Sequence, residues 1–172
     1  MLTADQIIEM LDLRPLPFEG GYYRETYRST EVIPRQALPA RFSSARSALT
    51  AIYYLLTPTS SVSAMHRLPT DEMYHFYAGD PVEMLQLYPD GRAVILTLGG
   101  DLAAGQRVQA MVPAGVWQGS RLSAGGGYAL MGVTVAPGFD MDDYQAAGRA
   151  TLLSLAPQQA ELIRVLTPDG EG

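Results

Sequence analysis

Both histidines of the chain, His66 and His75, lie in one short stretch that also contains Asp71 and Glu72. Histidine is the side chain whose charge changes closest to neutral pH, and it is also a common metal ligand. Carboxylates such as those of Asp71 and Glu72 are the usual partners in acid–base and metal chemistry. Any imidazole chemistry of this protein must therefore come from the segment 66–79.

The composition removes several other chemistries. The chain has no cysteine, which excludes disulfides, thiolate catalysis and cysteine-bound metal sites. It also has no lysine, because all 12 basic residues are arginines, so Schiff-base catalysis is excluded. No nucleophile elbow, phosphate-binding glycine loop or dinucleotide fingerprint is present.

Length and charge favour one domain and argue against polyanionic partners. The 172 residues are 47% hydrophobic, enough for one sizeable core, and we expect a single domain over residues 1–172. The net charge of −6 argues against nucleic acid or an anionic membrane as a partner. The N-terminus lacks a secretory pattern and no apolar run approaches the roughly 20 residues of a membrane span, so we expect an unprocessed, soluble, cytoplasmic protein.

The pattern of the chain predicts an all-β fold with peripheral helices. Thr3 and Gln6 form a capping-box pattern at the start of a short helix over about residues 3–12. Apolar residues at helical spacing, broken by Pro157, predict two short helices over about 149–166. Between them, over about 20–145, short runs rich in aromatic and β-branched residues predict the strands of a sandwich or barrel. These runs are 22–28, 48–56, 61–66, 72–77, 82–88, 93–98, 106–112 and 128–135.

Two turns and one loop are also expected. Pro89, Asp90 and Gly91 separate two strand runs and predict a hairpin, and the glycines of 125–127 predict another turn. Residues 32–46 contain two prolines and few periodic apolar residues, which is typical of a long loop.

Several motifs resemble those of the cupin superfamily. His66, Glu72 and Gly79 match its first motif in part, and Pro113 and Gly115 match its second. The chain is most similar to the cupin 5 family, also called domain of unknown function 985. The blocks that carry this resemblance are 19–25, 50–56, 71–81, 112–117 and 133–139. The resemblance implies a double-stranded β-helix, or jelly roll, that commonly forms a homodimer and has a pocket inside the barrel. It implies no established reaction.

The chain departs from the metal-binding cupins at two ligand positions. Leu68 stands where the first motif has its second histidine, and Gln118 stands where the second motif has a histidine. His75 is an odd number of residues from Glu72, so on a regular strand the two side chains face opposite sides unless a bulge intervenes. We therefore expect no cofactor. A divalent metal is the less favoured alternative, with His66, Glu72, His75 and Gln118 as its ligands.

A metal-free pocket gives the same residues a role in proton transfer. His66 would act as the base and a tyrosine as the acid, with Glu72 beside them. Metal-free sugar-nucleotide epimerases of the cupin superfamily resemble this arrangement, and Tyr128 is our candidate for the tyrosine. A pairing of His66 with Asp71 or Glu72 at a strand end would explain the same residues without any catalysis.

Other polar or aromatic residues are candidates for ligand binding. Trp117, the only tryptophan, could stack on a planar ligand or anchor a core, and Arg24 could bind a carboxylate or form a salt bridge. Polar groups within apolar strands are costly unless paired, which favours pocket positions for Gln86 and Thr134. The full set of predicted ligand-binding residues is Arg24, Tyr53, Ser63, His75, Gln86, Trp117 and Thr134.

Three functions are compatible with these residues. The first is an isomerase or epimerase acting on a sugar, a nucleotide-like molecule or a carboxylated metabolite. The second is a non-catalytic module that binds or senses a small molecule. The third is a metal-dependent cupin oxygenase or isomerase.

Overall fold

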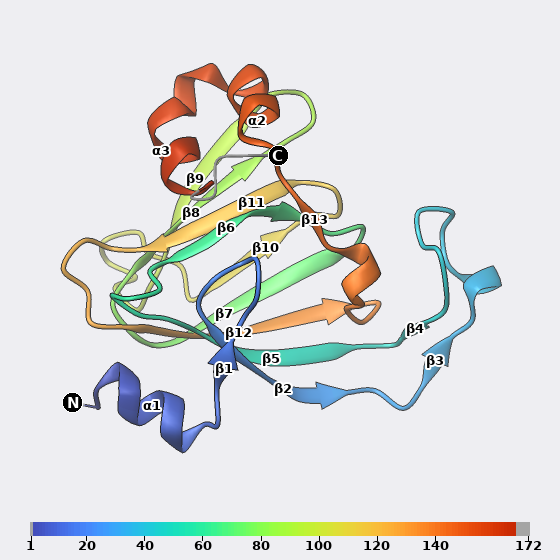
Figure 1. The fold of residues 1–172 in the computed structure, drawn as a ribbon, viewed down its shortest axis with the longest axis horizontal. Helices are drawn as coiled ribbons and strands as arrows, with labels where there is room; N and C mark the ends of the chain where they lie inside the picture. Colours follow the sequence, from blue (N-terminus) through green and yellow to red (C-terminus); the bar gives the residue numbers. More distant parts are fainter. Residues whose placement is uncertain (1, 168–172) are drawn as a thin grey trace.

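The protein is a two-sheet jelly roll with helices on the outside (Figure 1). The computed structural model describes residues 2–167. Within them, the first sheet has its strands in the order β1 (Arg14–Pro15), β2 (Tyr22–Arg28), β5 (Thr50–Leu56), β12 (Ala129–Ala136), β7 (Asp71–Gly79) and β10 (Gln109–Val112). The second sheet has the order β13 (Gln145–Ala146), β6 (Val62–Arg67), β11 (Trp117–Leu122), β8 (Val82–Leu87) and β9 (Ala93–Leu98). All pairings within both sheets are antiparallel.

The helices lie where the sequence predicts them. Helix α1 (Ala4–Met10) begins at Thr3, whose hydroxyl accepts a hydrogen bond from the Gln6 backbone while the Gln6 side chain accepts one from the Thr3 backbone. The C-terminal helices are α2 (Arg149–Leu155) and α3 (Ala160–Val165), separated by the short turn η3 (Pro157–Gln159). None of the described helices is long and apolar enough to cross a membrane.

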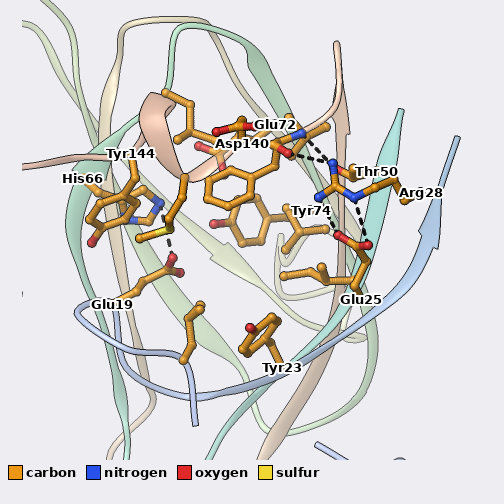
Figure 2. Close-up of a pocket in the computed structure, with 17 residues that line it drawn as sticks. Glu19, Tyr23, Glu25, Arg28, Thr50, His66, Glu72, Tyr74, Asp140 and Tyr144 are labelled. Carbon is orange, nitrogen blue, oxygen red and sulfur yellow. Dashed lines mark hydrogen bonds and ion pairs between the residues drawn. The ribbon is translucent and has the colours of Figure 1, made fainter. Parts of the chain in front are cut away.

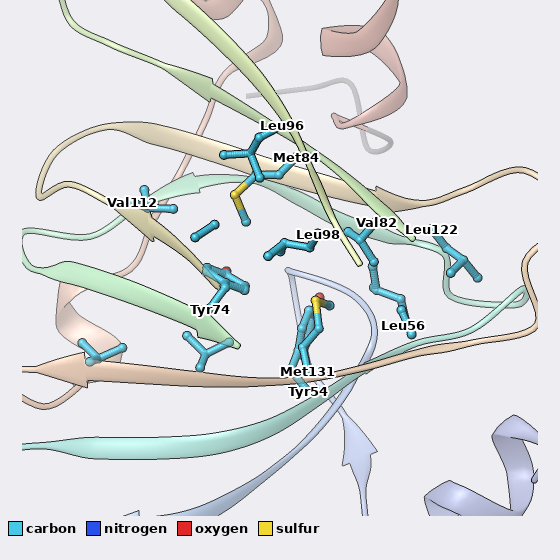
Figure 3. Close-up of a cluster of buried hydrophobic side chains, with 14 of the residues drawn as sticks. Tyr54, Leu56, Tyr74, Val82, Met84, Leu96, Leu98, Val112, Leu122 and Met131 are labelled. Atoms are coloured by element: carbon cyan, nitrogen blue, oxygen red, sulfur yellow. The ribbon is translucent and has the colours of Figure 1, made fainter. Parts of the chain in front are cut away.

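Three buried clusters hold these layers together. The largest fills the space between the two sheets and includes Tyr54, Tyr74, Met84, Leu98 and Met131 (Figure 3). A second cluster packs α2 and α3 against the outer face of the second sheet, and a third packs α1 near Leu55 of the first sheet. Alternation along each strand sends neighbouring residues to opposite faces, so Tyr54 lies in the inner cluster and Leu55 lies beneath α1.

All eight predicted β runs contain strands, but one central strand was not predicted. Strand β11 lies between β6 and β8 in the second sheet. Its inward positions include Gln118 and Ser120, which are polar yet fully buried, so the strand lacks the apolar alternation used to find the others. The predicted hairpin at Gly91 joins β8 and β9 as expected.

The predicted loop 32–46 has local structure of its own. It contains β3 (Val32–Ile33), which pairs with β4 (Arg46–Ser47), and the short turn η1 (Arg35–Ala37). Arg46, at the end of this segment, is buried and reaches the turn η2 (Met141–Asp143). The loop is thereby joined to the part of the chain that closes one side of the barrel.

Candidate functional site

An internal cavity of about 450 Å³ opens between the two sheets. Figure 2 shows that its side chains come from both sheets and from the segment around η2. The lining residues are Leu16, Glu19, Tyr23, Glu25, Arg28, Thr50, Ile52, His66, Leu68, Glu72, Tyr74, Val133, Val135, Phe139, Asp140, Met141 and Tyr144. The predicted catalytic residues His66 and Glu72 are therefore both in this cavity.

Strand geometry places the polar residues of the cavity. On β7, Glu72 and Tyr74 face inward at even spacing, and His75 lies on the opposite face. On β6, the pairing with β11 shifts by one residue between the Gln118 and Ser120 positions. This irregularity lets Ser63 and His66 both point to the interior although they are an odd number of residues apart.

Glu19 enters the cavity from a tight turn before β2. The turn needs glycine at the next position, because Gly20 has a φ of 96° and a Cβ there would lie 2.4 Å from the Val62 carbonyl oxygen. The Ala64 backbone nitrogen donates to the Glu19 carbonyl at 2.7 Å, and the Ser63 hydroxyl donates to Glu19 Oε1 at 2.8 Å. Ser63, predicted to bind a ligand, is not among the lining residues of the cavity and instead fixes the position of Glu19.

Both ring nitrogens of His66 have partners. Nδ1 lies 2.8 Å from the Ala64 carbonyl, which can only accept, so Nδ1 carries a proton. Nε2 lies 2.7 Å from Gln118 Nε2, and the same amide nitrogen donates to the Tyr74 hydroxyl at 2.8 Å. The ring also stacks on Tyr144 with a centroid distance of 5.1 Å.

The charges of this cluster influence each other. Burial raises the pKa of Glu72 to about 7, against the opposing effect of His66, and the negative charge of Glu19 adds to the rise. Burial lowers the pKa of His66, but Glu19, Glu72 and the Ala64 carbonyl outweigh it, so that pKa lies above its ordinary value. Burial, with Glu19 and Glu72, also raises the pKa of Tyr144, which keeps its hydroxyl protonated. The cavity therefore holds a carboxyl group that is half ionised near neutral pH.

The mouth of the cavity is closed by an ion pair and by the segment 139–144. Arg28 Nη2 lies 2.7 Å from Glu25 Oε2, and Nη1 donates to the Phe139 carbonyl at 3.2 Å (Figure 2). The Phe139 backbone nitrogen in turn donates to the Thr50 hydroxyl at 2.9 Å. Because Asp140, Met141 and Tyr144 line the cavity, these contacts fix one of its walls.

Four of the predicted ligand-binding residues lie outside the cavity, on the outer face of the first sheet. Arg24 stacks over the Tyr53 ring at 5.5 Å, and Tyr53 meets Tyr77 edge to face. His75 contacts Gln109 at 3.0 Å and Thr134 at 3.4 Å. Strand alternation explains this placement, because these residues neighbour inward-facing ones in sequence.

Three more predicted residues also lie away from the cavity. Trp117 packs near α2 and α3 with the Arg67 guanidinium 4.3 Å above its ring. Tyr128, the predicted acid, packs in the cluster beneath α1. Gln86 is buried between the sheets and donates to the Met111 carbonyl at 3.0 Å, so its amide has a structural partner.

The donor set does not fit a metal centre. Among residues 2–167, no three His, Asp or Glu side chains come together as a group that could hold an ion. His75 is on the far side of β7 from Glu72, and Gln118 presents its amide nitrogen to His66. In this orientation the Gln118 amide nitrogen offers a metal ion no lone pair.

Sequence reasoning did not select Glu19, Tyr144, Arg28 or Asp140 as site residues. Glu19 did have a signal, since it precedes two glycines in one of the family-like blocks. Tyr144 and Asp140 follow the last long strand in a stretch without periodic pattern. Only the fold brings that stretch back to the cavity.

Comparison with known proteins identifies the family. The model of the family described as Cupin superfamily (DUF985) matches residues 5–147, and the chain belongs to that family. An uncharacterized protein of Saccharomyces cerevisiae, YML079W, is 32% identical over 135 residues, a match that covers 73% of this chain and 66% of that protein. The match thus spans just under two thirds of that relative's length.

Solved structures agree on the fold. A hypothetical protein from Leishmania major superposes with a TM-score of 0.85 at 33% identity, covering 96% of this chain and 99% of that one. Protein SO0799 from Shewanella oneidensis gives 0.84 at 36% identity, covering 97% and 98%. Oxalate decarboxylase from Bacillus subtilis gives 0.54 at 15% identity, covering 94% of this chain and 38% of that one, which shows a shared cupin fold only.

Proposed function

We propose that this cupin binds a small polar molecule in its internal cavity and catalyses a proton transfer on it, as an isomerase or epimerase does. The observation that carries the proposal is Glu72. Its carboxyl group is buried, faces the cavity and has a pKa of about 7. A general base works best when its pKa lies near the working pH.

Glu72 suits the role of base better than His66. The sequence hypothesis gave this role to His66, but both ring nitrogens of His66 already have hydrogen-bond partners. Glu72, in contrast, faces the cavity with its carboxyl group, and a hydrogen bond from the Gln118 side chain opposes the rise that burial causes in its pKa. The positive charge that His66 gains on protonation would then stabilise ionised Glu72.

Tyr144 supplies the complementary donor. Its hydroxyl is buried and has no hydrogen-bond partner within residues 2–167, and it belongs to the lining of the same cavity. In the proposed step, Glu72 takes a proton from a hydroxyl-bearing carbon next to a carbonyl group. The C–H electrons form a C=C bond, the C=O π electrons move to the oxygen, and Tyr144 donates a hydrogen bond to that oxygen. Glu72 then returns the proton to the former carbonyl carbon, and transfer of the hydroxyl proton to the other oxygen completes the isomer.

The test is proton exchange with solvent. Metabolites that raise the melting temperature would be incubated with the protein in deuterated buffer, and loss of a carbon-bound proton would be followed by NMR. We expect exchange with the unchanged protein and a rate at least about 100-fold lower in Glu72→Gln. Ligands that bind but never exchange would contradict the proposal.

The alternative is a non-catalytic module that binds or senses a ligand. The hydrogen-bond network of His66, Gln118 and Tyr74 favours it, because such a network stabilises a rigid pocket wall and needs no substrate. The same ligands would then bind equally well to Glu72→Gln without any exchange in either protein.

A further inference from the structure

The cationic groups of the cavity are already paired within the protein, in part with an acidic residue. All three guanidinium nitrogens of Arg28 donate, Nε and Nη2 to Glu25 and Nη1 to the Phe139 carbonyl. His66 is engaged through both ring nitrogens. An anionic ligand would therefore have to compete with Glu25 for Arg28 and would meet His66 only at Nε2, beside the Gln118 amide nitrogen.

The carboxylate oxygens of the cavity, in contrast, still have positions at which they can accept hydrogen bonds. Glu72 faces the cavity with its carboxyl group, and Glu19 Oε2 lies 3.8 Å from His66 Nε2, beyond hydrogen-bond distance. Asp140, at the mouth, uses Oδ1 to accept from the Asp142 backbone nitrogen. The negatively charged surface that the cavity offers a ligand is therefore made of these carboxylate oxygens.

The charge balance points the same way. The lining contains the carboxyl groups of Glu19, Glu25, Glu72 and Asp140, against Arg28 and His66 as the basic groups. Because Glu25 already neutralises Arg28, the carboxyl groups that remain outnumber His66. A second anion in such a low-dielectric space would be repelled, whereas a cation would be attracted.

The walls around these oxygens are aromatic and apolar. The rings of Tyr23, Tyr74, Phe139 and Tyr144 surround the cavity, and Figure 2 shows Tyr23, Tyr74 and Tyr144 on different sides of it. Aromatic faces attract organic cations, and carboxylates beside them add a direct partner for an ammonium group.

We propose that the ligand of this cavity carries a protonated amine, held by Glu19, on a carbon skeleton such as that of an amino sugar. The proposal uses the same cavity as the proposed function and specifies its ligand. It also narrows the expectation from sequence, which allowed carboxylated and nucleotide-like molecules. Those ligands would need a cationic partner, and Arg28 is already neutralised by Glu25.

The test compares probes that share a skeleton and differ in charge. The first set is glucosamine, glucose and glucuronate, and the second is cyclohexylmethylamine, cyclohexylmethanol and cyclohexanecarboxylate. Binding to the full chain would be measured by calorimetry or ligand-observed NMR. We expect the amine of at least one set to bind at least about tenfold more tightly than its carboxylate partner.

Variants connect the preference to the proposed residues. Glu19→Gln, which keeps the side-chain shape, should weaken amine binding at least about tenfold, and Asp140→Asn at the mouth should weaken it less. Glu31→Gln, an exposed change outside the cavity, should have no effect. Three results would overturn the inference. In the first, neither amine binds; in the second, the carboxylates bind as tightly as the amines of the same sets. In the third, the amine affinity is unchanged in Glu19→Gln.

This inference and the proposed function can fail separately. Selective amine binding without carbon-proton exchange would contradict only the proposed reaction. Exchange on a carboxylated or phosphorylated ligand would contradict only the amine preference.

Discussion

The Nε2 atom of His66 lies 2.7 Å from the side-chain nitrogen of Gln118. Since Nδ1 donates to the Ala64 carbonyl, neutral His66 has its lone pair on Nε2, where the Gln118 amide can donate to it. A protonated His66 would instead need an acceptor there, and rotation of the amide would offer Gln118 Oε1, which otherwise has no partner among the described residues. The charge of His66 and the orientation of Gln118 are thus linked.

Replacement of Gln118 by glutamate should raise the pKa of His66 further. The new carboxylate would lie beside Nε2 and favour the charged ring. Because the chain has only two histidines, the imidazole signals can be followed by NMR and assigned with His75→Gln. Gln109→Glu is a matched control, since it places the same charge beside His75 on the other face of β7. An unchanged His66 titration in Gln118→Glu would show that the contact does not govern its charge.

Stability should fall as the pH rises toward 7 and just beyond. Glu72 has a pKa raised from 4.5 to about 7, so between these values the folded state binds more protons than the unfolded state. The raised pKa of His66 acts in the same direction at higher pH, as its proton is lost. Integrated over the window of Glu72, the loss is on the order of 3 kcal/mol.

Urea unfolding as a function of pH measures this effect. Glutamine at position 72 cannot ionise, so the free energy of unfolding of Glu72→Gln should fall less with rising pH. Above about pH 7 this variant should be more stable than the wild-type protein. The exposed change Glu31→Gln should leave the profile as it is. If the free energy of unfolding of the wild-type protein rose between pH 4.5 and about 7, Glu72 would not be buried in its neutral form.

The sequence predicted the fold and part of the site, for reasons that particular residues make clear. His66, Glu72 and Gly79 stand close together in the chain, and strand alternation correctly placed His75 on the opposite face from Glu72. Glu19 and Tyr144 reach His66 only through long-range folding, which leaves no local pattern. The sequence drew attention to Gln118 only through the metal question, at the position of an absent histidine and as an alternative ligand. The strand that carries it was not predicted, because its inward positions are polar.

The alternation of side chains along a strand does not by itself say which face of the strand points into the barrel. Tyr53 and Thr134 looked like pocket residues because they are polar within apolar strands, yet their inward neighbours are the ones that meet the core and the cavity. A shift of one residue reverses such an assignment. Homodimer formation, which the family resemblance implies, stays a prediction.

Gly79 should not tolerate a side chain. Its φ is 102°, and an added Cβ would lie 2.2 Å from the Tyr128 carbonyl oxygen, a backbone atom that cannot move aside cheaply. Gly79→Ala should therefore destabilise the fold by more than about 2 kcal/mol in urea unfolding. Gly105 is the control: its φ of 79° is similar, but nothing lies within 4 Å of an added Cβ, so Gly105→Ala should cost only about 1 kcal/mol. Equal costs would mean that backbone strain dominates and the contact with Tyr128 does not.

The protein should function without a bound metal. The site offers His66, Glu72 and Glu19, but His66 is engaged through both nitrogens, and no group of three suitable side chains forms within residues 2–167. Elemental analysis of protein purified without a histidine tag or chelator should give less than stoichiometric transition metal. Treatment with chelator should then leave both the melting temperature and any exchange activity unchanged, and a loss of either would contradict this expectation.

The buried pair of Arg46 and Asp143 should control the wall of the cavity. Arg46 Nη2 lies 2.6 Å from Asp143 Oδ1 and Nε lies 2.7 Å from Oδ2, and both residues are almost fully buried. Removing one partner leaves a buried charge without compensation, so Arg46→Met or Asp143→Leu should each cost about 3–5 kcal/mol in urea unfolding. The double variant should recover much of this loss, because it removes both charges.

The exposed pair of Arg121 and Glu83 is the matched control for that cycle. These two side chains lie 2.9 Å apart but remain partly open to solvent, so breaking their pair should cost less than about 1 kcal/mol. The Arg46 and Asp143 variants should also weaken ligand binding more than the control does, because Asp143 adjoins Tyr144 and belongs to the same turn as Met141. Additive costs in the double variant, with ligand affinity unchanged throughout, would show that this ion pair neither couples the loop to the turn nor positions the cavity wall.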